Sequence, residues 1–462
     1  MAEDKAEDQE REEEDYRLDG EVVDLILEAV EAEDAPRLAA LMEPLHAADI
    51  ADLLEQIGGA ERRGILRLWG REIDGEILTE IDESIREEVI DAMPRDVLAE
   101  AVRELDSDDV VDLIEDLEEP QQEAILDALD DTDRAAVEQS LAYPEYSAGR
   151  LMQREVVMAP EHWTVGEAID HMRRNKKELP EQFYHVILVD PRMKPSGYVT
   201  LGKILSSKRA VPLTAIVEDS FRTISVYQEE ADVAYAFNQY HLISAPVVDE
   251  NDRLVGIITI DDAMAVLDEE HEEDILRLAG VGDESAISDT VLETVRQRLP
   301  WLGVNLLTAI LASSVIKEFE NTISQLVALA VLMPIVASMG GNAGTQTLTV
   351  AVRALATKDL TESNVWRVIR REAFVGLLNG LTFALCMGLV AWVWFGTPAL
   401  GGVIAVAMVI NLFVAAVGGI VVLLAPEKMG ADPALASGTF VTTLTDVVGF
   451  FAFLGLATAV LL

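Results

Sequence analysis

Two clusters of oxygen-bearing side chains stand inside long apolar stretches of this chain, where they could bind a cation. The first contains Asp446, the only acid between Pro433 and Leu462. Burying a carboxylate in a membrane costs roughly 3 kcal/mol on insertion scales, and no Lys, Arg or His stands near Asp446 in any apolar stretch. A metal ion is therefore its natural countercharge, and Thr442 lies one helical turn earlier on the same face. The alternative is a protonated carboxyl group that is hydrogen-bonded within a helix bundle.

The second cluster is "GGNAGTQ" (residues 340–346), within the uncharged stretch from Asn321 to Val352. Its glycines predict close helix approach and a loosened backbone with free carbonyl groups, which membranes tolerate only where protein or water covers it. Its amide and hydroxyl oxygens are ligands of the kind that a hard divalent cation, or its hydration shell, requires. Glycine-mediated packing, with Asn342 and Gln346 as hydrogen-bonding groups between helices, is the competing interpretation.

A third, acidic group precedes the apolar half of the chain. It lies in "LDEEHEEDILRLAG" (residues 267–280), a pattern that predicts a helix running through about Arg298 into the first apolar stretch. Candidate metal ligands here and just upstream are Asp261, Asp262, Glu269, Glu270, Glu273 and Asp274. Local alternatives are a solvated helix face and helix capping by Asp261 or Asp262.

The apolar half predicts five membrane spans. The uncharged stretches are Leu299–Ile316, Asn321–Val352, Ala373–Pro426 (divided into two spans by "FGTPALGG", residues 395–402) and Pro433–Leu462, which holds a single acid. Each span is long enough to cross a bilayer. Basic residues precede the first span and lie between the second and third: Arg296, Arg298, Arg353, Lys358, Arg367, Arg370 and Arg371. The positive-inside rule then predicts a cytoplasmic amino terminus and a carboxyl terminus outside the cell.

The composition argues against several classes of protein. The formal net charge is −48, with the acid concentrated before Gly280, whereas nucleic-acid binding needs patches of Lys and Arg. Such a surface suits either cation binding or solvation in high salt. Cys386 is the only cysteine, so we expect no disulfide within the chain and no cysteine-based metal site. No histidine follows residue 298, which disfavours a membrane metalloprotease.

The acidic half contains two kinds of repeat. "DIADLLEQIGGAERRGILRL" (49–68) matches "DVVDLIEDLEEPQQEAILDA" (109–128) at most positions, which predicts a small helical solenoid. After about Val156 the order strand, helix, strand, strand, helix occurs twice, and "PVVDENDRLVGIITIDD" (246–262) resembles the CBS domain. The resemblance implies a tandem CBS pair, a module that often binds adenine nucleotides. Related transporters hold the nucleotide partly through a polar pair, and Gly202 and Lys203 stand in that place here, which leaves ATP an open alternative.

The order of modules resembles the MgtE family of magnesium transporters and channels. "PIVASMGGNAGTQ" (334–346) and "DPALASGTFVTTLTD" (432–446) match the family's membrane motifs. The resemblance implies a multidomain fold: an all-α solenoid-like amino-terminal domain, an α+β tandem CBS pair, a connecting plug helix and an all-α domain of five transmembrane helices. The expected boundaries are 1–19 (disordered acidic tail), 20–142 (amino-terminal domain), 143–208 and 209–268 (CBS 1 and CBS 2), 269–298 (plug) and 299–462 (pore domain).

The family also implies a homodimer in the cell membrane with a Mg²⁺ pore between the subunits. Its pore contacts correspond to Gly341, Asn342, Thr345, Thr442 and Asp446, and a cytoplasmic-side cation contact corresponds to Asp432. We therefore expect a channel, not an enzyme, in which Mg²⁺ is both transported and regulatory. Abundant cytosolic Mg²⁺ would bridge the acidic faces of the amino-terminal domain, CBS pair and plug, and close the pore. The alternatives are a transporter of another divalent cation such as Co²⁺ or Mn²⁺, a CBS-regulated membrane enzyme, and a structural or sensory membrane protein.

Overall fold

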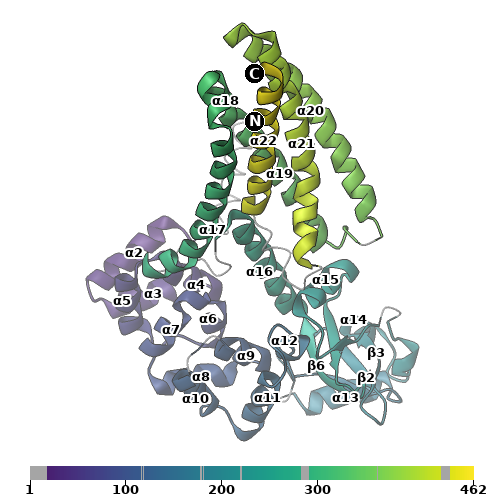
Figure 1. The fold of residues 1–462 in the computed structure, drawn as a ribbon. Helices are drawn as coiled ribbons and strands as arrows, with labels where there is room; N and C mark the ends of the chain where they lie inside the picture. The colour runs from purple at the N-terminus through teal and green to yellow at the C-terminus, as the bar shows by residue number, and fades with distance from the viewer. Residues whose placement is uncertain are drawn as a thin grey trace, which may run out of the picture. The chain divides into compact units, whose positions relative to one another are not determined.

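The computed structural model describes residues 18–115, 117, 119–176, 179–180, 182–218, 221–281, 291–361, 363–427 and 438–462. The chain forms two compact units, with the boundary in the sequence between Asp268 and Glu269. We call them the amino-terminal unit and the membrane unit. The predicted fold class is confirmed: a helical part, a pair of small α+β domains and a helical membrane part follow one another along the chain (Figure 1).

Short helices build the first part of the amino-terminal unit. They are α2 (Gly20–Glu31), α3 (Ala35–Met42), α4 (Ala47–Gln56), α5 (Gly59–Trp69), α6 (Gly75–Glu80), α7 (Glu83–Ala92), α8 (Arg95–Glu104), α9 (Ser107–Glu115), α10 (Glu119–Leu126), α11 (Asp131–Leu141) and α12 (Ala148–Leu151). The two similar sequences form the matching pairs α4–α5 and α9–α10, as predicted. Several of the acids serve as helix caps: Asp34, Asp74 and Asp130 each accept a backbone N–H from the first turn that follows.

Two three-stranded sheets follow, and each has the predicted order of elements. The first repeat contains β1 (Met158–Pro160), α13 (Val165–Arg174), β2 (His185–Val189), β3 (Pro195–Thr200) and α14 (Leu201–Ser206), and a 3₁₀ turn, η1 (Leu213–Ala215), separates it from the second. The second repeat contains β4 (Ile224–Ser225), α15 (Glu230–Tyr240), β5 (Ser244–Val248), β6 (Leu254–Thr259) and α16 (Ile260–Ala279). In each sheet the first pair of strands is parallel and the second pair is antiparallel.

The hairpin turns of the two repeats are built alike. Asp190 accepts the backbone N–H groups of residues 192 and 194, and Asp249 accepts those of residues 251 and 253. Met193 and Asp252 take the same left-handed backbone position, with φ of 63° and 59°. The sheets are joined by a buried hydrogen bond between His185 Nδ1 and Ser244 Oγ. The internal repeat is therefore structural as well as sequential.

Helix α16 differs from the prediction at its carboxyl end. It stops at Ala279, and Gly280 follows with φ of 72°, a conformation that only glycine adopts without strain. The next helix, α17 (Val291–Glu318), begins after residues outside the described part. The expected continuous helix through about Arg298 is therefore wrong, because Gly280 ends it.

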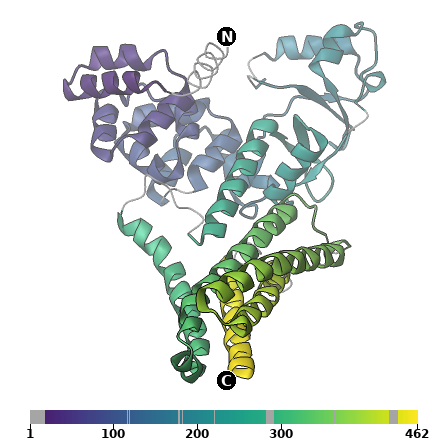
Figure 2. The ribbon, with the colours of Figure 1, turned by 90° about the horizontal axis from the view of Figure 1, so that it is seen from above.

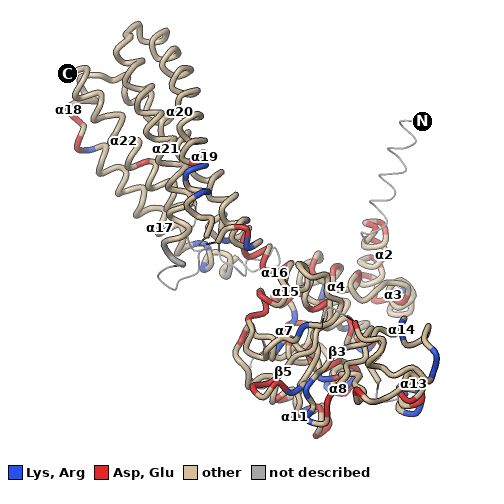
Figure 3. Tube along the Cα trace, turned by 90° about the vertical axis from the view of Figure 1, so that its right-hand side faces the viewer, with Lys and Arg blue, Asp and Glu red and all other residues tan. Residues whose placement is uncertain are grey.

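The membrane unit consists of long apolar helices. After α17 and the short α18 (Glu320–Gln325) come α19 (Ala328–Ala356), α20 (Val365–Phe395), α21 (Pro398–Glu427) and α22 (Gly438–Leu461). Within the described residues, five helices are long and apolar enough to cross a membrane: 294–318, 328–356, 365–395, 398–424 and 438–461. Charged residues are scarce along these helices, whereas they are frequent along the trace of the amino-terminal unit (Figure 3). The predicted number of spans is confirmed.

Helices α19, α21 and α22 pack against one another, α20 packs mainly on α21, and α17 packs on α22 (Figures 1 and 2). Glycine permits this close approach. A Cβ atom on Gly419 of α21 would lie 2.9 Å from the Gly344 carbonyl oxygen of α19, and one on Gly380 of α20 would lie 2.9 Å from Val409 Cα of α21.

Helix α19 passes through "GGNAGTQ" without a break. The expected loosened backbone is therefore wrong at this place. A helix satisfies its own backbone groups, and that requirement outweighs the low helix propensity of glycine where water is excluded. The glycines serve packing instead.

Candidate functional site

One face of α19 carries polar side chains that are exposed in the single chain. Ser338, Asn342, Gln346 and Thr349, which we call the polar stripe, are spaced by four, four and three residues and so share one helix face. The Nδ2 atom of Asn342 donates to Ser338 Oγ at 3.3 Å within the stripe. Exposing amide and hydroxyl groups to lipid at this depth is energetically unfavourable. We therefore expect the stripe to face a water-filled pathway or additional protein.

Asp446 lies on α22 with a half-buried side chain. Among the residues that the structure describes, its carboxylate has no hydrogen-bond or ion-pair partner. Thr442, one turn earlier, is also half-buried, and its hydroxyl donates to the Thr439 carbonyl at 3.0 Å. Thr445 is fully buried, as expected for a residue on another face. The described part of the protomer thus supplies no countercharge for Asp446.

The two membrane motifs lie against each other. A Cβ atom on Gly341 of α19 would be 3.4 Å from Thr442 Cγ2 of α22, and one on Gly438 would be 3.8 Å from Thr345 Oγ1. The structure therefore brings Gly341 and Thr345 together with α22 near Thr442. No hydrogen bond joins Asn342 to Asp446 within the described residues: Asn342 is exposed on α19, whereas Asp446 is half-buried on α22.

Three polar residues of this region escaped the sequence analysis. Ser338 and Thr349 extend the polar stripe, and their spacing from Asn342 and Gln346 was the available signal. Asn411 of α21 is fully buried between helices, and the signal for it was a lone amide within an otherwise apolar span. Asn342 and Gln346, the two amides expected to form hydrogen bonds between helices, are both exposed in the single chain. Asn411 forms such an interhelical hydrogen bond instead.

The acidic candidates outside the membrane share one helix. Asp261, Asp262, Glu269, Glu270, Glu273 and Asp274 all lie on α16, which continues across the expected boundary at residue 268. Glu273 forms an ion pair with Arg277 at 2.9 Å. No group of three or more His, Cys, Asp or Glu within the described ranges is arranged to hold a metal ion. Asp432 lies outside the described residues.

The Asp262 side chain caps α16, as the local alternative predicted. It accepts the Thr259 hydroxyl at 2.5 Å and the Thr259 backbone N–H at 3.3 Å. Its surroundings are acidic. Burial, together with the negative charge of Asp261, raises its pKa to about 6 despite these hydrogen bonds.

Helix α9 presents two further carboxylates to Asp262, and none of the sequence patterns had indicated them. Burial and the charge of Asp262 raise the pKa of Asp109 to about 7 and hold the pKa of Asp108 well above its ordinary range. Asp108 is only 9% exposed. The first turn of α9 and the first turn of α16 thus bring three interacting carboxylates together.

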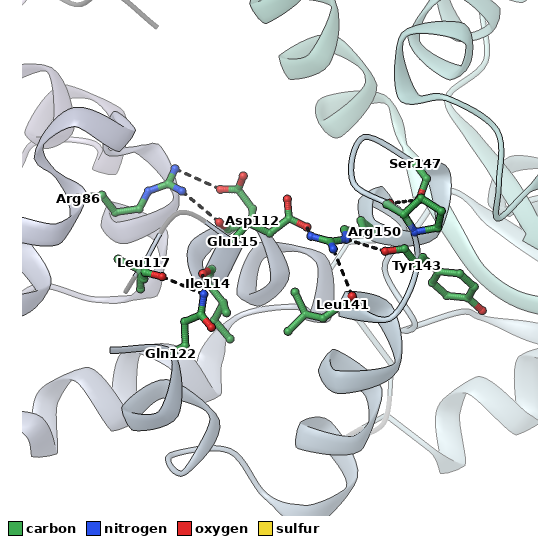
Figure 4. A network of polar contacts seen from close by, with 11 residues as sticks. Arg86, Asp112, Ile114, Glu115, Leu117, Gln122, Leu141, Tyr143, Ser147 and Arg150 are labelled. Carbon is green, nitrogen blue, oxygen red and sulfur yellow. Dashed lines mark hydrogen bonds and ion pairs between the residues drawn. The ribbon is translucent and has the colours of Figure 1, made fainter. Parts of the chain in front are cut away.

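A polar network ties the helical part of the amino-terminal unit to the start of the CBS pair (Figure 4). Arg150 of α12 donates to Glu115 Oε1 of α9 at 2.6 Å and to the carbonyls of Tyr143 and Leu141 at 3.0 and 3.2 Å. On the other side of α9, Arg86 of α7 pairs with Asp112 at 3.2 Å. These contacts fix α9, and with it Asp108 and Asp109, against the CBS pair.

Lys203, which stands where related transporters hold a nucleotide, already has partners within the chain. The backbone N–H of Lys203 donates to Thr200 Oγ1 at 3.3 Å at the start of α14. Its ammonium group forms an ion pair with Glu218 at 3.0 Å. A phosphate group at this position would have to compete with the Glu218 carboxylate.

Three family models match the chain. Residues 333–456 match MgtE, described as a divalent cation transporter, residues 45–146 match the MgtE intracellular N domain, and residues 148–209 and 217–269 match the CBS domain. Among curated proteins, the chain is similar to the magnesium transporter MgtE of Thermus thermophilus, at 33% identity over 93% of this chain and 96% of that one. It is also similar to the magnesium transporter MgtE of Enterococcus faecalis, at 34% identity over 70% of each chain.

The solved structures that are similar to the chain include two from magnesium transport proteins. The cytosolic domain of the Mg²⁺ channel MgtE in complex with ATP is 28% identical, with a TM-score of 0.49, covering 53% of this chain and 99% of that one. The soluble part of a magnesium transporter is 23% identical, with a TM-score of 0.47, covering 54% of this chain and 98% of that one.

Proposed function

Because this chain belongs to the MgtE family of divalent cation transporters, we propose that it admits Mg²⁺ to the cell through a pore between the two subunits of a homodimer. Curated relatives similar over most of the chain are magnesium transporters, and five apolar helices are present here. The pore would be lined by α19 and α22.

One observation carries this proposal: two polar surfaces of neighbouring membrane helices are left at least partly exposed within the described residues. The polar stripe of α19 is exposed, and the Asp446 carboxylate of α22 has no partner among the described residues. Gly341 and Thr442 hold the two helices in contact beside these surfaces. A second copy of the chain, with a hydrated cation between the copies, would satisfy both surfaces at once.

The chemistry of the donors favours a hydrated hard cation. Mg²⁺ gives up its water reluctantly and often keeps several water molecules when it binds. Two Asp446 carboxylates, one from each subunit, would supply charge, while Asn342, Thr345 and Thr442 would hydrogen-bond to the water shell. Oxygen donors alone disfavour tight chelation of Co²⁺ or Mn²⁺ but permit their passage, so these ions are the alternative cargo.

We further propose that cytosolic Mg²⁺ closes the pore by binding to the acidic residues of α16 and of the surfaces that face it. When Mg²⁺ is scarce, these carboxylates repel one another, and when it is abundant, it bridges them. The repulsion among Asp108, Asp109 and Asp262 supports this idea, because burial disfavours their negative charge and a nearby cation would relieve it, although these three carboxylates are not themselves arranged as a metal site. ATP binding near Lys203 remains a separate proposal, as does the carboxyl terminus outside the cell.

The test is ion flux into liposomes that contain the purified full-length protein. We expect Mg²⁺ influx that stops when Mg²⁺ is preloaded inside, weaker flux of Co²⁺ and Mn²⁺, and loss of influx in Asp446→Asn. Thr443→Val is a matched control on the same helix, since its hydroxyl bonds only to the Thr439 carbonyl of its own helix. Unchanged influx in Asp446→Asn would remove the pore assignment, and flux of Co²⁺ or Mn²⁺ without Mg²⁺ would favour the alternative cargo.

A further inference from the structure

Asn411 is a fully buried amide at the point where α19, α21 and α22 meet. It lies on α21 and has 0% exposure. Its Nδ2 atom donates to the Val336 carbonyl of α19 at 2.8 Å. Its Oδ1 atom has no hydrogen-bond partner in the part of the chain that the structure describes. The amide therefore crosses between two helices and leaves one acceptor unsatisfied.

Two glycines make room for this amide, one on each neighbouring helix. A Cβ atom on Gly340 of α19 would overlap the amide nitrogen of Asn411 and lie 2.8 Å from its Cγ. A Cβ atom on Gly449 of α22 would lie 2.8 Å from Nδ2 and 3.0 Å from Cγ. Real Cβ atoms essentially never approach closer than 3.0 Å, so a side chain at either glycine would force the Asn411 amide to shift from this position. The amide and the two glycines form one complementary set.

Membrane packing alone does not explain an asparagine here. A leucine or alanine would bury no polar atom, whereas the unsatisfied Oδ1 atom lowers the stability of the bundle. Buried polar groups in helix bundles are best attested as groups that specify register and alignment rather than as sources of stability. The hydrogen bond to Val336 sets the depth of α19 against α21, and contact with Gly449 sets the rotation of α22.

Both glycines adjoin the proposed ion pathway. Gly340 immediately precedes Gly341 and Asn342, and Gly449 follows Asp446 by three residues, which is less than one helical turn. Any change in the depth or rotation of either helix at Asn411 moves these groups relative to one another. We propose that Asn411 is a positioning residue that aligns α19 and α22 so that the polar stripe and Asp446 act on the same ion. This inference rests on the proposed function, because it assigns the alignment a role in ion selection.

The test is size complementation with ion preference as the readout. In liposomes, we expect Asn411→Ala to lower the ratio of Mg²⁺ to Ca²⁺ influx by about tenfold. Gly340→Ala with native Asn411 should lower it similarly, because its methyl group overlaps the amide. The double variant Asn411→Ala/Gly340→Ala should recover part of the native ratio, because the new methyl group occupies space that the amide has left while the hydrogen bond to Val336 stays absent. Gly402→Ala, which has no atom within 4 Å of its Cβ position, is the control and should behave as the native protein does.

A second readout does not require transport. Cys386 is the only cysteine, so Cys386→Ser gives a thiol-free background in which Thr442→Cys reports on the water access of α22. We expect Asn411→Ala to change the rate at which a charged thiol reagent modifies this cysteine, and the double variant to restore it. If Asn411→Ala does not assemble, Gly449→Ala makes the same test with the amide in place.

Two outcomes would overturn the inference. One is an Asn411→Ala protein with native ion preference and native thiol reactivity. The other is a double variant in which the reductions of the Mg²⁺ to Ca²⁺ influx ratio seen in the two single variants add up instead of partly cancelling. A native protein that carries no Mg²⁺ would defeat the proposed function instead, and the thiol measurement would still decide whether Asn411 aligns the helices.

Discussion

Gly341 and Thr442 are in contact across two helices that are far apart in the sequence: a Cβ atom on Gly341 would lie 3.4 Å from Thr442 Cγ2. This is an ordinary van der Waals distance, so the absence of a side chain lets α19 and α22 approach without strain. The contact joins the two sequence motifs that carry the oxygen-bearing side chains. It gives the candidate pathway two walls made from one protomer.

The polar stripe gives the first prediction. Asn342→Leu and Gln346→Leu should each slow Mg²⁺ influx by about tenfold or more, because each removes hydrogen bonds to the hydrated ion, and bonds to charged groups are worth about 1.5–3 kcal/mol. Liposome flux at fixed protein density is the measurement. Leu385→Ala is the control, since this side chain on α20 is 77% exposed and apolar. Native flux in both leucine variants would mean that the stripe faces something other than the ion.

Gating gives the second prediction. Replacing Glu269, Glu270, Glu273 and Asp274 by their amides should leave influx at low internal Mg²⁺ unchanged but remove its inhibition by high internal Mg²⁺, because the proposed closed state would lose its bridging ligands. Flux is measured at several internal Mg²⁺ concentrations. A matched control replaces four acids of α2, Glu21, Asp24, Glu28 and Glu31, and so removes the same charge elsewhere. If both variants respond alike, total charge and not the α16 residues governs closure.

Adjacent glycines of α21 give the third prediction. A Cβ atom on Gly401 would lie 2.5 Å from the Gly388 carbonyl oxygen of α20, whereas one on Gly402 would meet nothing within 4 Å. Gly401→Ala should therefore force the two backbones apart and destabilise the protein by about 1–3 kcal/mol, as overpacking does. Gly402→Ala should be close to neutral. Thermal unfolding in detergent measures both, and equal melting temperatures would show that α20 and α21 do not pack this closely.

The carboxylate cluster gives the fourth prediction, on pH. The folded-state pKa values of Asp109, about 7, and Asp262, about 6, lie above the ordinary value of 3.8. The folded state therefore binds more protons than the unfolded state between about pH 4 and pH 7, so its free energy of unfolding falls as pH rises through this window. The contribution is complete below about pH 4 and is lost above about pH 7.

Hydrogen exchange of the full-length protein with metal chelated can measure this effect. Protection factors of the peptide that contains α9 should fall as pH rises from about 5 to 8, after correction for intrinsic exchange rates. Asp109→Asn should flatten the dependence, and added Mg²⁺ should raise protection at the high end. A peptide from α2 is the internal control. Equal protection of α9 at pH 5 and pH 8 in the native protein would contradict the prediction.

The Arg150 network gives the fifth prediction. Arg150→Ala should destabilise the amino-terminal unit by about 2–4 kcal/mol, because it removes bonds to one carboxylate and two carbonyls and leaves them partly buried. Arg150→Lys should rescue little, since a single ammonium group cannot reach all three acceptors. Arg67, which pairs with Glu33 at an exposed site, is the control, and Arg67→Ala should cost less than about 1 kcal/mol. Urea unfolding with limited proteolysis measures all three.

Much of the architecture could be predicted from local patterns. The solenoid repeat, the paired sheets and the five spans each follow from periodicity or from the length of an uncharged stretch, and such signals need no knowledge of distant contacts. Two local inferences were wrong. Gly280 ends α16 where charge and apolar spacing alone predicted continuation. "GGNAGTQ" stays helical because a membrane-buried backbone must satisfy its own hydrogen bonds, whatever the propensity of its residues.

The candidate site, too, has features that the sequence reveals and features that only the structure reveals. Asp446 could be identified without a structure, since a carboxylate in an apolar stretch without a basic neighbour is conspicuous in the sequence. The proximity of Asp109 to Asp262 could not be, because the two belong to different repeats and the chain carries acids at many similar positions.

The amino-acid sequence by itself determined that this protein has an acidic repeat-containing part and five apolar spans with one intramembrane acid, because hydrophobic length and charge are properties of the chain. Only the tertiary structure decided which face of α19 is exposed, that Gly341 touches Thr442, and that Asn411 lies between Gly340 and Gly449. These relations depend on the depth and rotation at which separate helices pack. That packing is fixed by the fit of side chains to glycines on other helices, which no single stretch of sequence contains.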